Sequence, residues 1–542
     1  MTRRGLTRAG AGRAAVVVAV IAAAAVTAGC TGTPSSSPTP SSAGSAYRPG
    51  QVPGLPDAAL DVMNQPQYAQ GRWLISVEDI DTGETLIDLD GDKMAEPGSF
   101  VKTYSAGAAW VKWGPDHTVS TPVKQNGTVN GGTLTGDLVL VGQGDLTMGG
   151  RTKADGTVDF ANLDHNDANP LPGATLTPEN PLAGLDELAA QVKASGISAV
   201  NGDVVIDDRL FSGELAGEPI TPTIINQNLL DVLVTPGAEG QPATAALTPA
   251  VAPWTLVNEV QTVAAGGPTK VTPPTPSPDN PNELVVTGTI AADSDPVLKV
   301  YVLDDTESFA RTAFIEALQR AGVTVSANPT APNSAATLPD QAAVTALPTV
   351  AALESLPLAE EVKYTMKISY NRGAQTFICR LAAEAGDPTC ESGMGIAQQI
   401  WADAGLDTLG ASLVDGSGLS GNFITPQNAV DIQTIFAKRP DAERWKETLP
   451  ILGVDGSLAD VQADSESAGK VFAKTGTLLG GDSFNGRYRL VTKTLGGVMD
   501  TESGRHLAFT VMVNTGFYDD LDGVFEANND VGAVAAAIQQ AY

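Results

Sequence analysis

The stretch that decides the fold of this 542-residue chain is residues 97–104, Pro97-Gly98-Ser99-Phe100-Val101-Lys102-Thr103-Tyr104. Proline and glycine end the preceding segment, and the apolar residues that follow have helical spacing. Ser99 and Lys102 are three residues apart, so in a helix they share one face and lie within hydrogen-bond reach. A hydroxyl held beside an amine is the arrangement of a serine nucleophile with a lysine base.

The same spacing also has a structural interpretation. Ser467 and Lys470 repeat it in this chain, and a serine can simply cap a helix while its lysine stays in water. The catalytic interpretation of Ser99 and Lys102 therefore depends on motifs elsewhere in the sequence.

Strand and helix signals on either side indicate a divided domain. Residues 72–79 and 85–89 read as two strands joined by a turn, and they lead into Ser99. After residue 113 the sequence pattern changes to short apolar runs separated by glycine turns. Long helical patterns return from residue 351. We therefore predict three units with the following boundaries. These are a catalytic domain of residues 52–113 plus 351–542, an inserted domain II of 114–202 plus 303–350, and an inserted β-rich domain III of 203–302.

The N-terminus has the pattern of an export signal. Several arginines precede the apolar run of residues 14–26, which is too short to cross a bilayer comfortably. Small residues then precede Cys30, which resembles the lipobox of bacterial lipoproteins. We predict a signal peptide of residues 1–29, lipidation of Cys30, and a flexible Ser/Pro/Thr-rich linker of residues 30–51. Ordinary secretion with cleavage nearby is the alternative.

Composition excludes several classes of site. The formal charge of −30 argues against a nucleic-acid partner. The three histidines are scattered without ligand-like spacing, so neither a histidine metal site nor a Ser-His-Asp triad is expected. Apart from Cys30, the only cysteines are Cys379 and Cys390. In an oxidising exterior they can form a disulfide, and two buried thiols are the alternative.

Two further motifs carry chemistry. Lys474-Thr475-Gly476-Thr477 follows a strand-like segment, and this combination offers a cation, hydroxyls and a close backbone approach to a ligand. The pattern Ser-x-Asn occurs four times. We select Ser369 and Asn371 because they interrupt a helical stretch, and polar groups at such a junction can project into a cleft.

In this order, Ser-x-x-Lys, Ser-x-Asn and Lys-Thr-Gly form the signature of penicillin-binding proteins and class A β-lactamases. The 270-residue gap between Ser99 and Ser369, and stretches such as residues 414–420 and 449–458, make the chain resemble a narrower group. This group is the class C low-molecular-mass penicillin-binding proteins, the D-alanyl-D-alanine carboxypeptidase/endopeptidase family. The resemblance implies an α/β (α+β) fold, the penicillin-binding-protein/serine β-lactamase-like transpeptidase fold, split by a large β-rich two-part insertion.

The resemblance also implies roles for the motif residues. Ser99 would be the nucleophile, Lys102 the general base and Ser369 a proton relay. Asn371 would hold the substrate amide. Burial and a second cation, Lys474, would together lower the pKa of Lys102. Thr475, Gly476 and Thr477 would bind substrate. The implied partners are peptidoglycan stem peptides, with β-lactams as covalent inhibitors and no metal or cofactor. A lipid anchor would hold the protein at the outer face of the cytoplasmic membrane, and its oligomeric state is undefined.

Some features depart from the family pattern. The usual Ala-Glu pair is Ala374-Gln375, residues 485–494 resemble an extra loop at the cleft edge, and we interpret residues 415–418 (Asp-Gly-Ser-Gly) as structural. Two other functions stay open. One is a β-lactamase or serine esterase on the same motifs, and the other is a non-catalytic cell-wall-binding lipoprotein.

Overall fold

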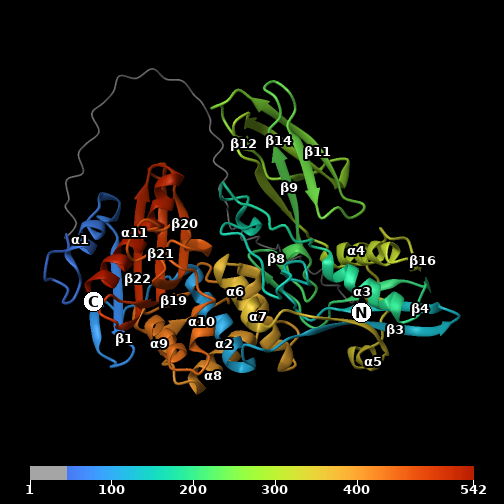
Figure 1. The fold of residues 1–542 in the computed structure, drawn as a ribbon, viewed down its shortest axis with the longest axis horizontal. Coiled ribbons are helices and arrows are strands. Elements are labelled where there is room, and N and C mark those ends of the chain that lie inside the picture. The colour runs from blue at the N-terminus through green and yellow to red at the C-terminus, as the bar shows by residue number, and fades with distance from the viewer. Residues whose placement is uncertain (1–45) are drawn as a thin grey trace, which may run out of the picture. The chain divides into compact units, whose positions relative to one another are not determined.

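The structure is a computed structural model that describes residues 46–542. The predicted signal peptide, Cys30 and linker residues 30–45 lie outside the described residues. A five-stranded antiparallel sheet joins the two ends of the described chain (Figure 1). Its strands, in spatial order, are β2 (Thr85–Leu89), β1 (Arg72–Asp79), β22 (His506–Tyr518), β21 (Arg487–Asp500) and β20 (Val471–Asp482).

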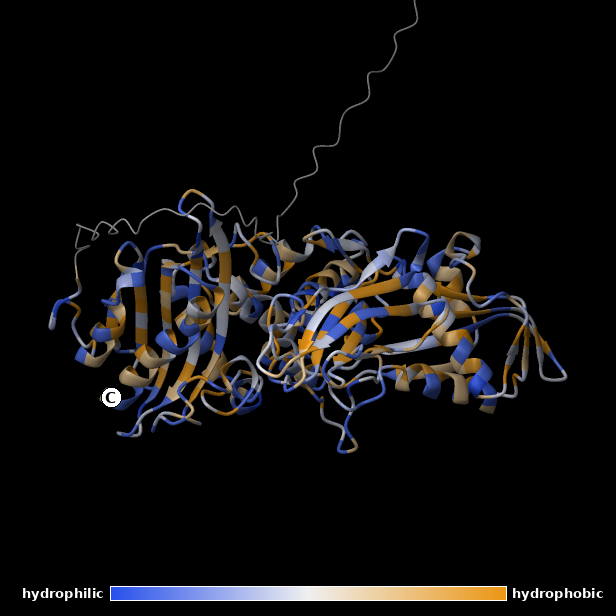
Figure 2. Cartoon of the chain, turned by 90° about the horizontal axis from the view of Figure 1, so that it is seen from above, coloured by the Kyte–Doolittle hydropathy of each residue, from blue (hydrophilic) through white to orange (hydrophobic). Residues whose placement is uncertain are grey.

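Both faces of this sheet are covered, and the strands carry broad apolar bands (Figure 2). Alternate residues point to opposite faces of a strand. Trp73 and Ile75 of β1 therefore join one core with α11 (Leu521–Ala541) and α1 (Asp57–Met63). Leu74 faces the opposite core, with α2 (Lys102–Trp113) and α9 (Pro426–Ala437). This double cover holds α2 against the sheet.

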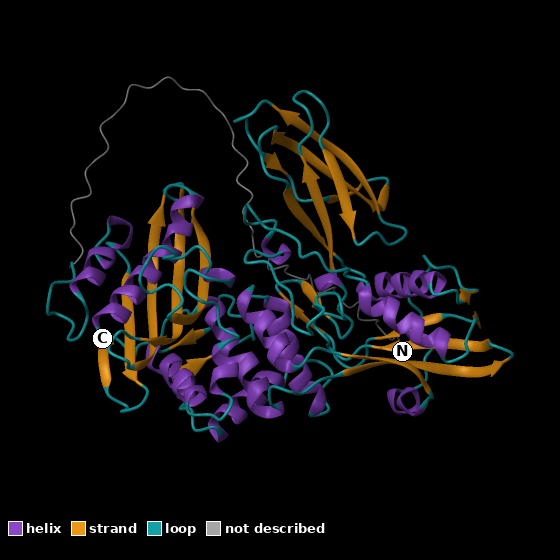
Figure 3. Ribbon diagram, viewed as in Figure 1, coloured by secondary structure: helices purple, strands orange, loops and turns teal. Residues whose placement is uncertain are grey.

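Further helices gather beside this sheet (Figure 3). They are α6 (Leu358–Lys367), α7 (Asn371–Glu384), α8 (Gly393–Asp403) and α10 (Ala442–Lys446). Every residue of α2 from Lys102 to Trp110 is buried among them. The predicted disulfide is present, because Cys379 of α7 bonds to Cys390. Among residues 46–542, no helix is both long and apolar enough to span a membrane.

The insertion is rich in strands, as predicted. Its largest sheet is six-stranded and packs against α3 (Ala183–Ala194) and α4 (Thr306–Arg320). The strands are β3 (Ser120–Asn130), β4 (Thr133–Val141), β5 (Ala199–Asn201), β6 (Val204–Asp207), β16 (Thr324–Val325) and β17 (Thr349–Glu354). The short helix α5 (Gln341–Ala346) precedes β17.

Two smaller sheets occupy the middle of the insertion. The first contains β9 (Leu229–Thr235), β10 (Thr244–Thr248) and β15 (Val297–Val302). The second contains β11 (Thr255–Val263), β12 (Lys270–Val271), β13 (Thr275–Ser277) and β14 (Asn280–Ala291). Two-stranded pairs complete the strands: β7 (Gly213–Leu215) with β8 (Glu218–Ile220), and β18 (Ala411–Ser412) with β19 (Phe423–Ile424).

The strand pairing adds detail to the sequence prediction. β6 pairs with β4 and β17 pairs with β3 in the six-stranded sheet. The three-part division into domains stays a prediction. The closing helix α11 begins at Leu521, where the Asp520 side chain caps it by accepting from the Gly523 N–H. The predicted loop of residues 485–494 is wrong for most of its length. Asn485 and Gly486 lie in the turn of the β20–β21 hairpin, and residues 487–494 belong to strand β21.

Candidate active site

Ser99 and Lys102 lie together at the start of α2. Ser99 is in a single 3₁₀ turn, Gly98–Val101, and α2 begins directly at Lys102. The Lys102 Nζ lies 2.8 Å from the Ser99 Oγ, and the lysine side chain is fully buried. The competing pair is not assembled, because Ser467 bonds to Gln539 and Lys470 pairs with Glu502.

Two carbonyl oxygens complete the surroundings of the Lys102 amine. The Asn371 Oδ1 lies 2.6 Å from Nζ, and the backbone oxygen of Ser417 lies 2.9 Å from it. The amine therefore has three polar neighbours: one hydroxyl and two carbonyls. The predicted Asn371 reaches the site, whereas the Ser417 oxygen was not anticipated.

Ser369 stands at the break between α6 and α7. Its φ of 58° is in the left-handed region, which a serine adopts only when its surroundings impose it. The Lys474 Nζ donates to the Ser369 Oγ at 2.9 Å and to the Thr475 backbone oxygen at 2.8 Å. Lys474 and Ser369 thus form a second lysine–serine pair beside the first.

Two glycines let the edge strand β20 approach the Ser99 turn. A Cβ on Gly476 would collide with the Pro97 carbonyl, and a Cβ on Gly98 would lie 2.7 Å from the Thr477 nitrogen. Gly98 also has a φ of 55°, which favours glycine. The backbone at Ser99 and the backbone at Thr477 therefore run against each other.

Residues 415–418 form the segment beside Lys102 that contains the Ser417 backbone oxygen. The Asp415 Oδ1 accepts from the backbone N–H groups of Ser417 at 2.7 Å and Gly418 at 2.8 Å. The Gln375 Oε1 accepts from the Gly416 N–H at 2.8 Å. Gln375 stands where the family usually has glutamate, and this hydrogen bond holds the segment of residues 415–418 in place. The predicted structural role of this motif agrees with these bonds, and its backbone also contacts the lysine.

Burial dominates the electrostatics of the two lysines. Desolvation lowers the pKa of Lys102 to about 7, against the opposing effect of the acids Asp415 and Asp167. Burial, followed by the charges of Lys102 and Lys493, lowers the pKa of Lys474 well below its usual value. Burial thus acts on Lys102 as predicted, whereas the charge of Lys474 is not among the causes of its lowered pKa.

Asp167 is one of two charged residues that sequence reasoning missed. It ends the 3₁₀ turn His165–Asp167 of the insertion, which the Arg151–Asp164 ion pair holds at 2.8 Å. The neighbouring Asn166 donates to the Ile368 oxygen at 3.4 Å, so this turn lies against the Ser369 junction. Burial raises the pKa of Asp167 to about 6. No motif marks this residue in the sequence.

Lys493 is the second missed residue. It lies on β21 directly opposite Thr477 of β20, and its Nζ donates to the Thr477 Oγ1 at 2.7 Å. Burial lowers its pKa to about 7. The interpretation of residues 485–494 as a loop hid this pairing, because only a strand register predicts it.

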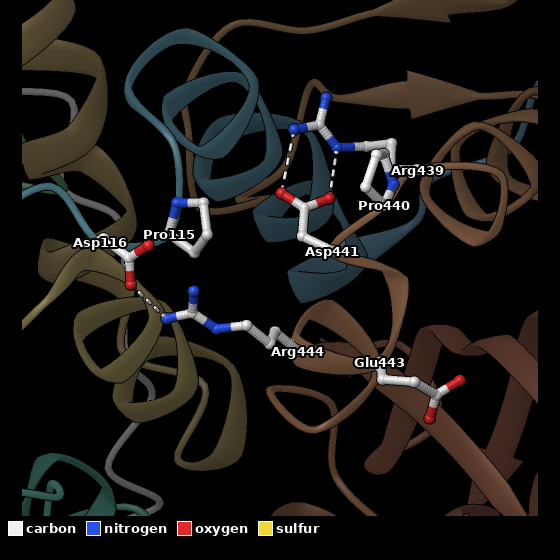
Figure 4. A pocket seen from close by; sticks show the side chains of 7 residues that line it. All are labelled: Pro115, Asp116, Arg439, Pro440, Asp441, Glu443 and Arg444. Atoms are coloured by element: carbon white, nitrogen blue, oxygen red, sulfur yellow. Dashed lines mark hydrogen bonds and ion pairs between the residues drawn. The ribbon is translucent and has the colours of Figure 1, made fainter.

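A separate pocket near α10 lacks this chemistry (Figure 4). Its volume is about 410 Å³, and four of its five charged residues already pair: Arg444 with Asp116 at 2.9 Å, and Arg439 with Asp441 at 2.8 Å. It contains no nucleophile with an adjacent base. Within residues 46–542, no cluster of histidine, cysteine, aspartate or glutamate is arranged to hold a metal ion.

A profile of the D-Ala-D-Ala carboxypeptidase 3 (S13) family matches residues 57–534. The chain belongs to this family. It is a serine-type D-Ala-D-Ala carboxypeptidase, a hydrolase of peptidoglycan, as the motifs predicted, and the family places it among exported proteins of the cell envelope.

Individual relatives agree with this assignment. The D-alanyl-D-alanine carboxypeptidase of Actinomadura sp. (strain R39) is 30% identical over 444 residues, which cover 76% of this chain and 74% of that protein. The D-alanyl-D-alanine carboxypeptidase DacB of Haemophilus influenzae is 23% identical over 82% of this chain and 86% of its own length. The crystal structure of penicillin binding protein 4 (dacB) from Haemophilus influenzae matches with a TM-score of 0.63 at 20% identity, covering 87% of this chain and 98% of that one. The predicted fold class is thereby confirmed.

Proposed function

We propose that Ser99 attacks the carbonyl carbon of a terminal D-Ala-D-Ala bond in a peptidoglycan stem peptide. The Ser99 Oγ–carbon bond forms, the D-Ala–D-Ala amide breaks, and D-alanine leaves with a proton on its new amine. Water then hydrolyses the acyl-enzyme and restores the hydroxyl. The observation that carries this proposal is the buried Lys102 Nζ at 2.8 Å from the Ser99 Oγ.

The neighbours of Lys102 suit a neutral amine. A neutral lysine has two N–H donors and one lone pair. The two carbonyl oxygens of Asn371 and Ser417 can take both donors, which leaves the lone pair for the Ser99 hydroxyl proton. A pKa of about 7 makes this form available at neutral pH, so Lys102 acts as the general base of acylation.

The second lysine–serine pair serves the leaving group. Ser369 passes a proton to the departing amine, and the Lys474 amine beside it orients that hydroxyl. Asn371 directs its oxygen to Lys102, so its amide nitrogen remains to hold the carbonyl of the substrate's amide.

Strand β20 binds the substrate along its free edge. Gly476 brings this edge close to the nucleophile, since a side chain at this position would collide with the Ser99 turn. The backbone N–H groups of Ser99 and Thr477 form the oxyanion hole, and the hydroxyls of Thr475 and Thr477 receive the terminal carboxylate.

The same site accounts for further activities that the sequence predicts. β-Lactams acylate Ser99 because they offer a strained amide to the same groups, and cross-linked stem peptides are a second substrate as in an endopeptidase.

Lipidation of Cys30, with the linker that follows it, anchors the enzyme to the outer face of the cytoplasmic membrane.

The experiment is intact mass of the mature protein after incubation with benzylpenicillin. The chain supplies a matched control, because Ser467 begins the other Ser-x-x-Lys sequence. We expect one adduct on the wild type and on Ser467→Ala, and none on Ser99→Ala. No adduct on folded wild type would reject the proposed acyl-enzyme mechanism. An adduct that survives in Ser99→Ala would show that another residue is the nucleophile.

A further inference from the structure

Strand β20 has one edge without a partner strand, and only part of that edge is open. β20 is the last strand of its sheet, so β21 pairs with its other edge (Figure 1). The backbones of residues 450–452 and 471–473 are bonded to each other through two N–H···O contacts of 2.9 Å, which close the first part of the edge. Within residues 46–542, no other strand pairs with this edge from Thr477 to Asp482. The open part therefore runs from the Ser99 site toward Asp482.

This open part presents the backbone groups that an added peptide strand needs. In an antiparallel ladder, every second residue directs its N–H and C=O away from the partner strand. Val471 and Ala473 do so, because these groups bond to residues 450–452. The one register shift of the hairpin leaves its extra residue on β21, so the alternation of β20 continues to Thr477 and Leu479. Thr477 supplies an oxyanion N–H in the function proposed above, and Leu479 continues the same edge beyond it.

The side chain of Arg489 lies across this part of β20. Arg489 is directly opposite Gly480 in the ladder, and a Cβ on Gly480 would be 3.3 Å from its guanidinium. Gly480 is four residues past Gly476, so the two glycines share one face of the strand, and at Gly476 this face lies against the Ser99 turn. The guanidinium is therefore on the face of the nucleophile, about 13 Å farther along the strand.

Arg489 is exposed, and among the described residues no carboxylate pairs with it. The nearby Arg487, in contrast, pairs with Asp482 at 3.0 Å and lies over the Phe517 ring. The chain has 62 acidic and 32 basic side chains, so acidic partners are abundant, yet none is placed here. A guanidinium keeps its positive charge in proteins and offers parallel N–H donors that fit a carboxylate. The position thus suits an anion that arrives with a ligand.

We propose that the edge of β20 beyond Thr477 binds the upstream residues of the stem peptide as an added strand, and that Arg489 binds a carboxylate in this upstream part. The residue that Ser99 attacks lies opposite Thr477, so the residue opposite Gly480 is three positions before it. The site therefore selects stem peptides with an acidic group at that distance from the attacked carbonyl. This proposal rests on the function proposed above, and it assigns a specificity role to a residue outside the three motifs.

The test compares three peptides that differ only in their upstream part. Diacetyl-Lys-D-Ala-D-Ala lacks this part. The pentapeptide Ala-γ-D-Glu-Lys-D-Ala-D-Ala carries a carboxylate there, because the γ-linkage lengthens the backbone by nearly one residue. Its matched form carries a carboxamide in place of that carboxylate. Release of D-alanine gives kcat/KM for each peptide. A charge-assisted hydrogen bond at an exposed site predicts that wild type prefers the carboxylate form over the carboxamide by about 3- to 10-fold.

Three variants locate the source of this preference. Arg489→Gln removes the charge, Arg489→Lys keeps it, and Arg320→Gln is the matched control, an exposed arginine at the end of α4 in the insertion. Arg489→Gln should abolish the preference and leave kcat/KM for the carboxamide and for diacetyl-Lys-D-Ala-D-Ala within about twofold of wild type, since neither peptide has the anion. Arg489→Lys should keep part of the preference, and Arg320→Gln all of it.

Equal kcat/KM of wild type for the carboxylate and carboxamide forms would overturn the proposal. An unchanged ratio in Arg489→Gln, or an equal loss on all three peptides, would overturn it as well. The first comparison uses wild type alone, so it remains decisive even if Arg489→Gln does not fold. A wild type that cleaves diacetyl-Lys-D-Ala-D-Ala without regard to the upstream carboxylate would reject only this proposal, whereas a wild type that cleaves none of the peptides would reject the proposed function.

Discussion

The pH dependence of acylation follows from the burial of Lys102. Only the neutral amine can take the Ser99 proton, and burial lowers the pKa of Lys102 to about 7. Below that pKa the neutral fraction falls tenfold per pH unit, so it is about 1% at pH 5 and almost complete at pH 9. We therefore expect the acylation rate constant to rise about 100-fold from pH 5 and to level off above pH 8.

The assay uses benzylpenicillin methyl ester, because an uncharged reagent keeps its own attraction to charged groups of the site out of the pH profile. The second-order rate constant of adduct formation is measured by intact mass between pH 5 and pH 9 at constant ionic strength. The slope and the plateau of the pH profile distinguish a Lys102 with a lowered pKa from one with its ordinary pKa. A lysine with its ordinary pKa near 10.4 would give a rate that still rises tenfold per unit at pH 9.

Two results would refute this reasoning. A flat profile between pH 5 and pH 8 would mean that no group titrating near 7 takes the proton. A steady rise without a plateau would mean that burial does not lower the pKa of Lys102. The control is Lys102→Ala, which should remain folded and lose acylation at every pH.

Two further predictions concern groups around the site. Replacing Asp167 by Asn removes a charge that raises the pKa of Lys102. The rise of the acylation rate with pH should therefore shift to lower pH, and acylation at pH 6 should be roughly twofold faster or more. An unchanged pH profile would show that Asp167 does not act on the base. Replacing Cys379 and Cys390 together by serine opens a short loop and should reduce the free energy of unfolding by about 2–3 kcal/mol. The measurement is thermal melting, and wild type in reductant should approach the variant, whereas identical melting curves would contradict a stabilising role.

Much of the site was predictable from local sequence. The Ser99–Lys102 pair depends on helical spacing, and a three-residue separation brings these side chains together in any helix. Alternation in residues 72–79 similarly predicted the strand β1, whose two faces join two cores. Ser369 and Asn371 were recognisable because they break a helical pattern. The structure contains these features as predicted, because each depends on residues only a few positions away in the sequence.

The tertiary structure alone decided the rest of the site. The Ser417 oxygen on the Lys102 amine comes from 315 residues farther along the chain. Asp167 reaches the lysines only because an inserted turn packs on the Ser369 junction. The contact of Lys493 with Thr477 requires the register of β20 and β21, and a shift of one residue would turn its side chain to the other face. Such contacts arise from packing between distant segments, which local periodicity does not encode.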